Sequence, residues 1–441
     1  MRSTLKVHYI EDILKGEKIG KNIELFAWIA SKREIGKIIF LDLVDSTGKI
    51  QALIKAGSTA FTNALKIKPE SSVKIKGIVR FRNPDIIEIE IEEIELIGDV
   101  LLQIDPRPRS AFNIFDQKYV STVIKNRHLY LRNEKLMAVL RVRHLFFEII
   151  RDWFRREHFI EFHAPILTEL LLYDDSSSFK LNFFNEEIFL TQCTAYYLES
   201  AIHAFERVYC VNPSFRAEKS RGKRHLAEYW HVKAEIAFAD LEDIINFVEK
   251  MVSYIIERIS TEAKKDLVTL GVDLDSIKLT MVPYRRIGYE DALQILNSKG
   301  INKRFGKSLS ESDETIISEE FDSLFWITGI PRVIEAFPYK IEPEKPRLTK
   351  TADLIATEGF GELLGVAEKI SRPEELLERM KEKGKDTDKR YDWYTQLRKF
   401  GSVPHSGFGM GVERMVRWLL RLDHVRDAIP FPRLFRHHPN P

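Results

Sequence analysis

The chain has 441 residues, which is long enough for two or three domains that each bury a core. Its 68 lysines and arginines nearly balance 66 aspartates and glutamates, and this net charge of +2 excludes nucleic-acid binding through a global basic field. The sequence shows no apolar leader and no stretch of about 18 apolar residues, which excludes a membrane span. Its two cysteines, Cys193 and Cys210, lack metal-ligand spacing and are too few for a disulfide framework. The sequence therefore predicts a soluble, cytoplasmic protein without a membrane partner.

Residues 1–99 predict a five-stranded OB-fold barrel. Five short stretches alternate apolar and polar residues, turn sequences separate them, and the helix-like segment FTNALKI lies between the third and the fourth. This order is typical of the OB-fold, which often binds nucleic acid. Residues 100–132 include the proline-containing stretch LLQIDPRPRSAF and are predicted to form a linker or hinge.

Residues 133–441 predict an α+β domain. Its first segment carries apolar residues at helical spacing with charges between them, which predicts a long amphipathic helix. Strand-like stretches and β-hairpins then alternate with helices in no βαβ order, and a glycine-rich strand leads directly into the last helix. We therefore expect a central antiparallel sheet flanked by helices rather than a doubly wound parallel sheet.

A cationic hairpin is the first candidate for chemistry. Arg216 and Glu218 stand two residues apart on a predicted strand, so their side chains share one face. The loop 219–224 adds several cations, with Gly222 at its turn, and His225 follows it. Such a loop is either a solvated hairpin tip or a clamp for a polyanion.

Acidic and glycine-rich segments complete the candidate site. Asp353 and Glu362 flank an acidic turn that contains glycine, and such oxygen ligands suit a hard divalent cation. Arg414 opens the last helix, just after a glycine-rich strand that lets backbone approach a ligand closely. The arginines, the carboxylates and the glycine-rich strand together favour the binding of a nucleoside triphosphate with Mg²⁺. The sequence contains neither a P-loop nor a dinucleotide fingerprint.

At this point the sequence resembles the class II aminoacyl-tRNA synthetases. Residues of about 139–168, 208–238 and 407–421 resemble motifs 1, 2 and 3 of that family, in the correct order. The N-terminal segment resembles the anticodon-binding OB domain of the aspartyl, asparaginyl and lysyl subclass. The stretches RAEKSRGKRHLAEYWHVKAE and YDWYTQLRKFGSVPHSGFGMGVERMV are most similar to the archaeal asparaginyl branch.

The resemblance implies roles for the candidate residues. Arg216 would hold the ATP α-phosphate and the substrate carboxylate, Arg414 the γ-phosphate end, and both would be catalytic by stabilising charge that develops on phosphate. Glu362, with Asp353, would hold Mg²⁺. The remaining positions implied to bind ATP are Glu218, Arg224, His225, Leu226, Gly411 and Glu413.

The amino-acid pocket departs from the family pattern. The family's E-G-G segment is here TELLLYDDSSSF, with Tyr173 where its glutamate belongs, and Q-S-x-Q-L-Y becomes TQCTAYYLES. G-E-I-x-G-G-S-x-R becomes GELLGVAEK, so Lys369 replaces the arginine that senses the substrate side chain. An arginine and a lysine are not equivalent at such a site. The residues expected at the amino acid are Tyr173, Gln192, Ala195, Tyr197 and Lys369.

In the barrel, the resemblance assigns tRNA anticodon contacts to three residues. Phe40 would stack on a base, Gln51 would read a base edge, and Arg33 would lie near the backbone. Because FLDL alternates, we expect Phe40 and Asp42 to point away from the barrel core together.

Three functions remain open on the sequence. The first is ATP- and Mg²⁺-dependent ligation of an amino acid, asparagine by preference, to tRNA through an adenylate. The second is a paralogue that adenylates a different amino substrate, in the manner of an asparagine-synthetase-like relative, or that has lost tRNA charging. The third is an RNA-binding module without catalysis. The family also implies a homodimer formed through motif 1, and no DNA partner.

Overall fold

The computed structural model describes residues 8–172, 175–220, 222–273 and 282–435, and it divides into two compact units. Unit 1 is Met1–Glu134 and unit 2 is Lys135–Pro441. No helix within the described ranges is long and apolar enough to cross a membrane. Residues 100–132, the predicted linker, hold three short helical segments, which are η1 (Gln117–Tyr119), α3 (Val120–Lys125) and α4 (Arg127–Tyr130).

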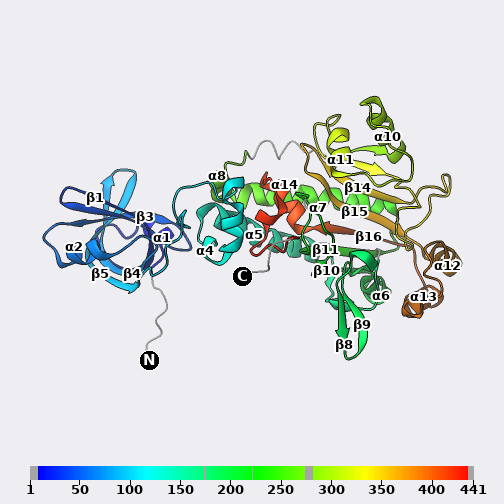
Figure 1. Ribbon diagram of the computed structural model, residues 1–441, viewed down its shortest axis with the longest axis horizontal. Helices are drawn as coiled ribbons and strands as arrows, with labels where there is room; N and C mark the ends of the chain where they lie inside the picture. Colours follow the sequence, from blue (N-terminus) through cyan, green and yellow to red (C-terminus); the bar gives the residue numbers. More distant parts are fainter. Residues whose placement is uncertain (1–7, 173–174, 221, 274–281, 436–441) are drawn as a thin grey trace. The chain divides into compact units, whose positions relative to one another are not determined.

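Unit 1 contains a closed five-stranded barrel in the order β1-β2-β3-β5-β4, as the alternation predicts (Figure 1). All neighbouring strands pair antiparallel except β3 and β5, which are parallel. Inward aliphatic side chains fill its core. The helix α2 lies between β3 and β4 in sequence, where the side chain of Ser58 caps its N-terminus. The elements are α1 (Ile10–Leu14), β1 (Asn22–Ile35), β2 (Ile38–Val44), β3 (Lys49–Lys55), α2 (Thr59–Lys66), β4 (Ser72–Asn83) and β5 (Ile86–Gly98).

Unit 2 is built on an eight-stranded sheet in the order β12-β13-β14-β15-β16-β11-β10-β6. The six central strands are antiparallel, as predicted, whereas the outermost pairs β12–β13 and β10–β6 are parallel. The strands are β6 (Ile160–Glu161), β10 (Arg207–Phe215), β11 (Glu228–Ala237), β12 (Arg285–Gly288), β13 (Phe325–Thr328), β14 (Thr351–Ala356), β15 (Gly361–Lys369) and β16 (His405–Gly411).

Long helices cover one face of this sheet. The amphipathic helix α5 (Glu134–Arg156) stacks Phe154 on Tyr209 of β10, with 4.0 Å between ring centroids, and α7 (Leu241–Glu262) packs against β15 and β16. The side chains of β11 that alternate toward this face, such as Val232 and Ala234, are fully buried. The opposite face of β11 is therefore left for a site.

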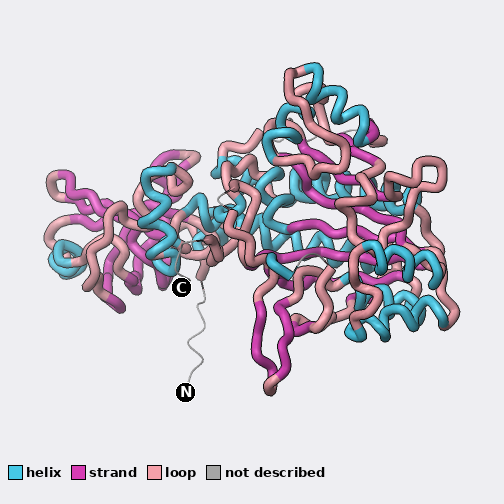
Figure 2. The backbone as a smooth tube through the Cα atoms, turned by 45° about the vertical axis from the view of Figure 1, so that its right-hand side comes forward, coloured by secondary structure: helices cyan, strands magenta, loops and turns pink. Residues whose placement is uncertain are grey.

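The remaining elements of unit 2 surround the sheet (Figure 2). The small sheet β7-β9-β8 extends away from the rest of the unit as a hairpin in both views. These elements are β7 (Leu167–Thr168), η2 (Asp175–Ser177), β8 (Lys180–Phe183), β9 (Glu186–Leu190), α6 (Ala195–Phe205), α8 (Lys264–Leu270), α10 (Tyr289–Ser298), α11 (Glu311–Ser318), α12 (Pro373–Glu382), η3 (Lys389–Tyr391), α13 (Asp392–Lys399), α14 (Val412–Leu419) and η4 (Val425–Ala428).

Candidate active site

A cavity of about 150 Å³ lies on the open face of the sheet, over β11, β16, β15 and β14. Glycines of β16 and β15 form its floor, because long side chains from the neighbouring strands lie across them. A Cβ at Gly409 would come within 2.8 Å of both His231 Nε2 and Lys233 Nζ, and one at Gly365 within 2.9 Å of Asp353 Oδ1. The glycine-rich strand therefore makes room for charged side chains as well as for a ligand.

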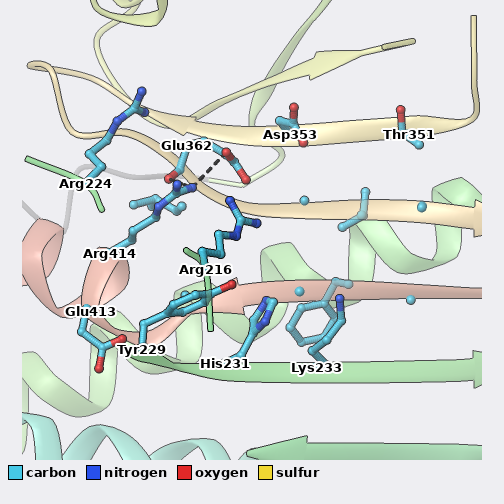
Figure 3. Close-up of a pocket in the computed structure, with 18 of the residues that line it drawn as sticks. Arg216, Arg224, Tyr229, His231, Lys233, Thr351, Asp353, Glu362, Glu413 and Arg414 are labelled. Carbon is cyan, nitrogen blue, oxygen red and sulfur yellow. Dashed lines mark hydrogen bonds and ion pairs between the residues drawn. The ribbon is translucent and has the colours of Figure 1, made fainter. Parts of the chain in front are cut away.

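The cavity has two ends. Arg216, Arg224, Arg414 and Glu362 gather at one, which we call the arginine end, and Lys233 lies toward the other (Figure 3). Lys233 with Glu235 and Lys369 forms what we call the lysine end.

At the arginine end, each of the three arginines pairs with a carboxylate. Arg414 Nη1 pairs with Glu362 Oε2 at 2.9 Å and also donates to the Glu362 carbonyl at 3.3 Å. Arg224 pairs with Glu314 of α11, whose carboxylate also accepts the Glu362 backbone N–H at 2.9 Å. Burial works against the charge of Glu362, but Arg414 with Arg216 and Arg224 holds the pKa of this carboxyl below its usual range. The end is thus prepared for an anion.

Gly361 shows how closely these groups are packed. Its φ of +70° is a conformation that favours glycine, and a Cβ there would overlap the guanidinium of Arg224. The turn before Glu362 therefore requires glycine for two independent reasons.

Arg216 follows the end of β10, and its guanidinium lies over the Tyr229 ring at 5.8 Å from the centroid. Glu218 lies 3.7 Å from Arg216 Nη1 and 3.5 Å from His225 Nε2, so it connects the two sides of the hairpin. Burial and the neighbouring arginines, Arg414 foremost, lower the pKa of His225, so its imidazole is neutral at pH 7. From the predicted loop, Arg224 lines the cavity, whereas Lys223 pairs with Asp423 outside it, and Arg221 lies outside the described residues.

The helix α14 contributes two further predicted residues. Gly411 caps its N-terminus and lines the cavity. Glu413 also lines it, but its carboxylate is buried and pairs with Arg143 of α5 at 2.7 Å, and it accepts the Trp230 backbone N–H at 3.0 Å. Glu413 therefore joins motifs 1, 2 and 3 to one another. Leu226, predicted beside it, is buried and lines the cavity as well.

The two predicted metal ligands lie on neighbouring strands. Asp353 is opposite Gly365 in the β14–β15 pair, and both Asp353 and Glu362 line the cavity. Burial, together with the charges of Glu362 and two other carboxylates, raises the pKa of Asp353 well above its usual range. Within the described ranges, no three His, Cys, Asp or Glu side chains come close enough to hold a metal ion alone. Two carboxylates completed by phosphate oxygens are nevertheless a common arrangement for Mg²⁺.

At the lysine end, charges are matched within the protein. Lys369 Nζ lies 3.0 Å from Glu235 Oε1 and 3.7 Å from Glu199 Oε1, and all three side chains are buried. Glu199 of α6 also pairs with Arg398, accepts the Tyr394 hydroxyl at 2.5 Å and lies 3.2 Å from His405 Nε2. Burial disfavours ionisation of Glu199, but Arg398 and Lys369 outweigh it and hold its pKa well below the usual range.

Among the described residues predicted for the amino acid, Gln192, Ala195 and Tyr197 do not line this cavity. Gln192 is buried and donates to Ser177 Oγ at 2.9 Å, and Ala195 opens α6. Tyr197 bonds Thr168 at 2.8 Å and stacks on Trp393 beside a separate surface hollow. Tyr173 lies outside the described residues. Of the predicted set, Lys369 is the one that the structure brings to the cavity.

The predicted set lacks several residues that line the cavity, and Glu235 of β11 is one of them. His231 and Lys233 follow Tyr229 at a spacing of two along β11, and Glu335 comes from a loop. The alternation of EYWHVKAE could have identified His231 and Lys233, because Arg216 had already assigned the hairpin to the site. Burial raises the pKa of Glu335 to about 7.

In the barrel, the three predicted tRNA contacts come from adjacent strands. Arg33 of β1 is opposite Phe40 of β2, and Gln51 of β3 is opposite Asp42. The burial pattern of β2 places Phe40 and Asp42 away from the core, which confirms the predicted facing. Asp42 pairs with Arg33 at 3.8 Å, and Gln51 accepts from Arg82 at 3.1 Å.

Comparison with known families identifies the class of protein. Residues 120–434 match the family model described as tRNA synthetases class II (D, K and N), and residues 23–97 match the OB-fold nucleic acid binding domain. The chain therefore belongs to the class II tRNA synthetases of the D, K and N group, and the resemblance inferred from its motifs is confirmed.

The individual relatives narrow the class to one branch. Asparagine–tRNA ligase of Pyrococcus abyssi is 40% identical over 430 residues, which cover 96% of this chain and 97% of that protein. Asparagine–tRNA ligase of Thermoplasma acidophilum is 32% identical over 95% of this chain and 96% of that protein. The crystal structure of Pyrococcus horikoshii asparaginyl-tRNA synthetase complexed with asparaginyl-adenylate superposes with a TM-score of 0.92 at 38% identity, covering 99% of both chains.

Proposed function

We propose that this protein is an ATP-dependent asparagine–tRNA ligase that acts through an asparaginyl-adenylate. The observation that carries the proposal is the convergence of Arg216, Arg414 and Glu362 over a glycine floor at the arginine end. Its full-length likeness to asparagine–tRNA ligases and to a synthetase crystallised with asparaginyl-adenylate supports the same conclusion.

Positioning and charge neutralisation account for the proposed chemistry. Arg216 holds the substrate carboxylate against the α-phosphate of ATP, so that the carboxylate oxygen attacks phosphorus and pyrophosphate leaves. Arg414 and Arg224 neutralise the departing phosphates, while Gly411 and Leu226 shape the wall of the site. Glu218 and His225 complete the nucleotide side of the hairpin. In the second half-reaction the tRNA terminal hydroxyl attacks the acyl carbon and releases AMP.

Magnesium is part of this proposal. Glu362 and Asp353 would hold Mg²⁺ together with phosphate oxygens, and the ion would supply charge neutralisation of the triphosphate. The raised pKa of Asp353 supports this assignment, because a buried carboxyl among other carboxyls is poised to ionise when a cation arrives.

The barrel is proposed to hold the anticodon. Phe40 supplies a stacking surface, with Arg33 and Gln51 on the adjoining strands. Family membership further supports a cytoplasmic homodimer that pairs through motif 1, which light scattering of the purified chain at several concentrations would test.

The test is amino-acid-dependent ATP–pyrophosphate exchange with each standard amino acid, beside charging of total tRNA. Exchange and charging with asparagine are expected, and both are expected to require Mg²⁺. If a correctly folded chain showed no activity in either assay, the proposal would be wrong and the protein would be a binding protein with a synthetase fold.

A second candidate is a paralogue that adenylates a different amino substrate. The observation that favours it is the lysine end, where Lys369 stands in place of the family's arginine and pairs with two glutamates. Exchange with another amino acid, or exchange without charging, would select this candidate.

A further inference from the structure

The lysine end places a donor and an acceptor side by side on one strand. Lys233 and Glu235 stand two apart on β11, so both project from the face that lines the cavity. Lys233 is 7% exposed and Glu235 is 1% exposed. Such burial makes the pairing of each polar atom energetically important.

Lys233 has donors to spare. Its Nζ donates to Cys193 Sγ at 3.0 Å, and among the described residues no carboxylate forms an ion pair with it. A lysine ammonium carries three donors, whereas a thiol is a weak acceptor. Because a Cβ at Gly409 would lie 2.8 Å from this Nζ, the ammonium stands over the cavity floor beside His231.

Glu235 has an acceptor to spare. Its Oε1 accepts from Lys369 at 3.0 Å, whereas its Oε2 is buried and finds no hydrogen-bond partner among the described residues. A buried carboxylate oxygen is costly to leave unpaired, so this atom favours a ligand that brings a donor. Lys369, which is itself held by Glu199, fixes the direction of the carboxylate.

We propose that Lys233 and Glu235 together read the side-chain carboxamide of the substrate. Lys233 donates to the amide oxygen, and Glu235 Oε2 accepts from the amide nitrogen. This inference rests on the proposed function and names the residues that select the amino acid. A carboxamide presents one acceptor and one N–H₂ donor on a single carbon, which this pair complements.

The same pair rejects aspartate. A β-carboxylate offers no hydrogen to Glu235, and it brings a second negative charge against Glu235 in a buried site. Lys369 acts through Glu235 as a positioning residue in this arrangement. Selection of asparagine over aspartate therefore depends on Glu235 of β11 rather than on Lys369 of β15.

Glu235→Gln is the sharpest test, because it exchanges the acceptor oxygen for a group that can also donate. The readout is the ratio of kcat/KM for asparagine to kcat/KM for aspartate in ATP–pyrophosphate exchange. We expect this ratio to fall by about tenfold or more, since an unpaired polar group in a site built for hydrogen bonding rejects the wrong substrate strongly.

Glu368→Gln is the matched control. Glu368 is a buried glutamate of β15 that pairs with Lys340 at 2.5 Å and Lys350 at 3.2 Å, and it does not line the cavity. Its substitution tests the loss of a buried charge without changing the lysine end. The ratio should stay at the wild-type value in this variant.

Lys233→Met tests the donor. We expect KM for asparagine to rise about tenfold or more while kcat changes less, with Lys233→Arg restoring much of the affinity because it keeps a donor. Lys350→Met is the control, because Lys350 lies just before β14, pairs with Glu368 and does not line the cavity. Circular dichroism and thermal unfolding show which variants are folded before their kinetics are compared.

The outcomes separate this inference from the proposed function. If wild type exchanges with asparagine but folded Glu235→Gln keeps the wild-type ratio, or folded Lys233→Met keeps the wild-type KM, the inference is wrong and the function stands. If wild type shows no exchange with asparagine, the proposed function fails and the carboxamide assignment fails with it.

Discussion

The arginine end and the lysine end of one cavity carry comparable charge, but they satisfy it in different ways. At the arginine end, Arg216, Arg224 and Arg414 pair with different carboxylates, but Arg216 and Arg414 still repel each other beside the cavity. At the lysine end, Lys369 is enclosed by Glu235 and Glu199 and belongs to the fold itself. The first end gathers like charges that a ligand would relieve, whereas at the second Lys369 is already paired within the protein and Lys233 and Glu235 Oε2 keep bonding capacity for a ligand.

This difference predicts which substitutions should lower activity and which should lower stability. Repulsion among like charges is tolerated at a site because the ligand relieves it, so removing one such charge costs function and not stability. A buried charge that is matched within the protein behaves oppositely, because its removal strands its partner.

The largest effect is expected from Arg216→Ala at the arginine end. Losing the side chain that holds the reacting groups should lower kcat/KM for ATP–pyrophosphate exchange by about a thousandfold or more. The thermal midpoint should stay level or rise, because Arg414 loses a like-charged neighbour. Exchange kinetics and calorimetry measure the two quantities.

Arg207→Ala is the control for that experiment. Arg207 begins β10, the strand that precedes Arg216, and forms an exposed ion pair with Glu157 at 3.9 Å. Its loss should change neither quantity. A large drop in the thermal midpoint of Arg216→Ala would contradict the distinction between the two ends.

Glu199→Gln should show the reverse at the lysine end. Removing this buried charge leaves Arg398 without its carboxylate partner and Lys369 with Glu235 alone, and the free energy of unfolding should fall by about 3–5 kcal/mol at pH 7. The folded-state pKa of Glu199 is depressed, so its contribution is present above the unfolded pKa of about 4.3. That contribution is lost as the pH falls through the folded pKa.

Urea unfolding of wild type and Glu199→Gln at pH 7 and in a series toward pH 3 checks this prediction. The gap between the two chains should narrow as the pH falls. A gap that stays constant would mean that the carboxylate is not ionised in the folded protein. Glu368→Gln is the comparison that reports on another buried glutamate of the same sheet.

The arginine end could be predicted from the sequence because its residues lie in contiguous motifs. Arg216, Glu362 and Arg414 each follow or begin a strand or helix whose pattern is visible, and their chemistry points to phosphate. The lysine end could not be predicted, since Glu199, Lys369 and Arg398 come from three distant elements and meet only through packing. The sequence predicts that Lys369 faces the substrate, whereas its pairing with Glu199 depends on tertiary packing.

The fold, like the site, could be predicted from the sequence only in part. Alternation along the first 99 residues predicts the order of the barrel strands, and turn residues separate them. The parallel edges formed by β12 with β13 and β10 with β6 escaped the prediction, because β6 and β12 are two and four residues long and pair with partners far away in sequence. Such short strands carry too few residues for a period to be visible.

Two glycines of β16 offer a smaller test that stays within one strand. A Cβ at Gly407 would overlap the Glu235 carboxylate, whereas one at Gly411 would meet Arg414 at an ordinary 3.6 Å. Gly407→Ala should therefore displace Glu235 and raise KM for the amino acid by about 10–100-fold, while KM for ATP changes little.

Gly411→Ala should leave KM for the amino acid close to wild type, since its φ of −74° suits any residue and its Cβ would meet only Arg414, at the arginine end. Exchange kinetics with varied asparagine and varied ATP give the two constants for each variant. If Gly407→Ala raised KM for ATP as much as KM for the amino acid, the two ends would not be separable along this strand.

The smallest effect is expected from Phe40→Ala, which should disturb neither end of the cavity. Phe40 lies on the outer face of the barrel, in a different compact unit from the site, and stacking on a base contributes about 1–3 kcal/mol. The substitution should raise KM for tRNA in charging by about tenfold, with ATP–pyrophosphate exchange and the thermal midpoint unchanged.

Phe26→Ala is the matched control, because Phe26 lies on β1 opposite Lys74 of β4, away from the β1–β2–β3 contacts. Equal losses in both variants would mean that barrel packing, rather than stacking by Phe40, supports charging. A loss of exchange in Phe40→Ala would contradict the assignment of Phe40 to the anticodon, because exchange is measured without tRNA.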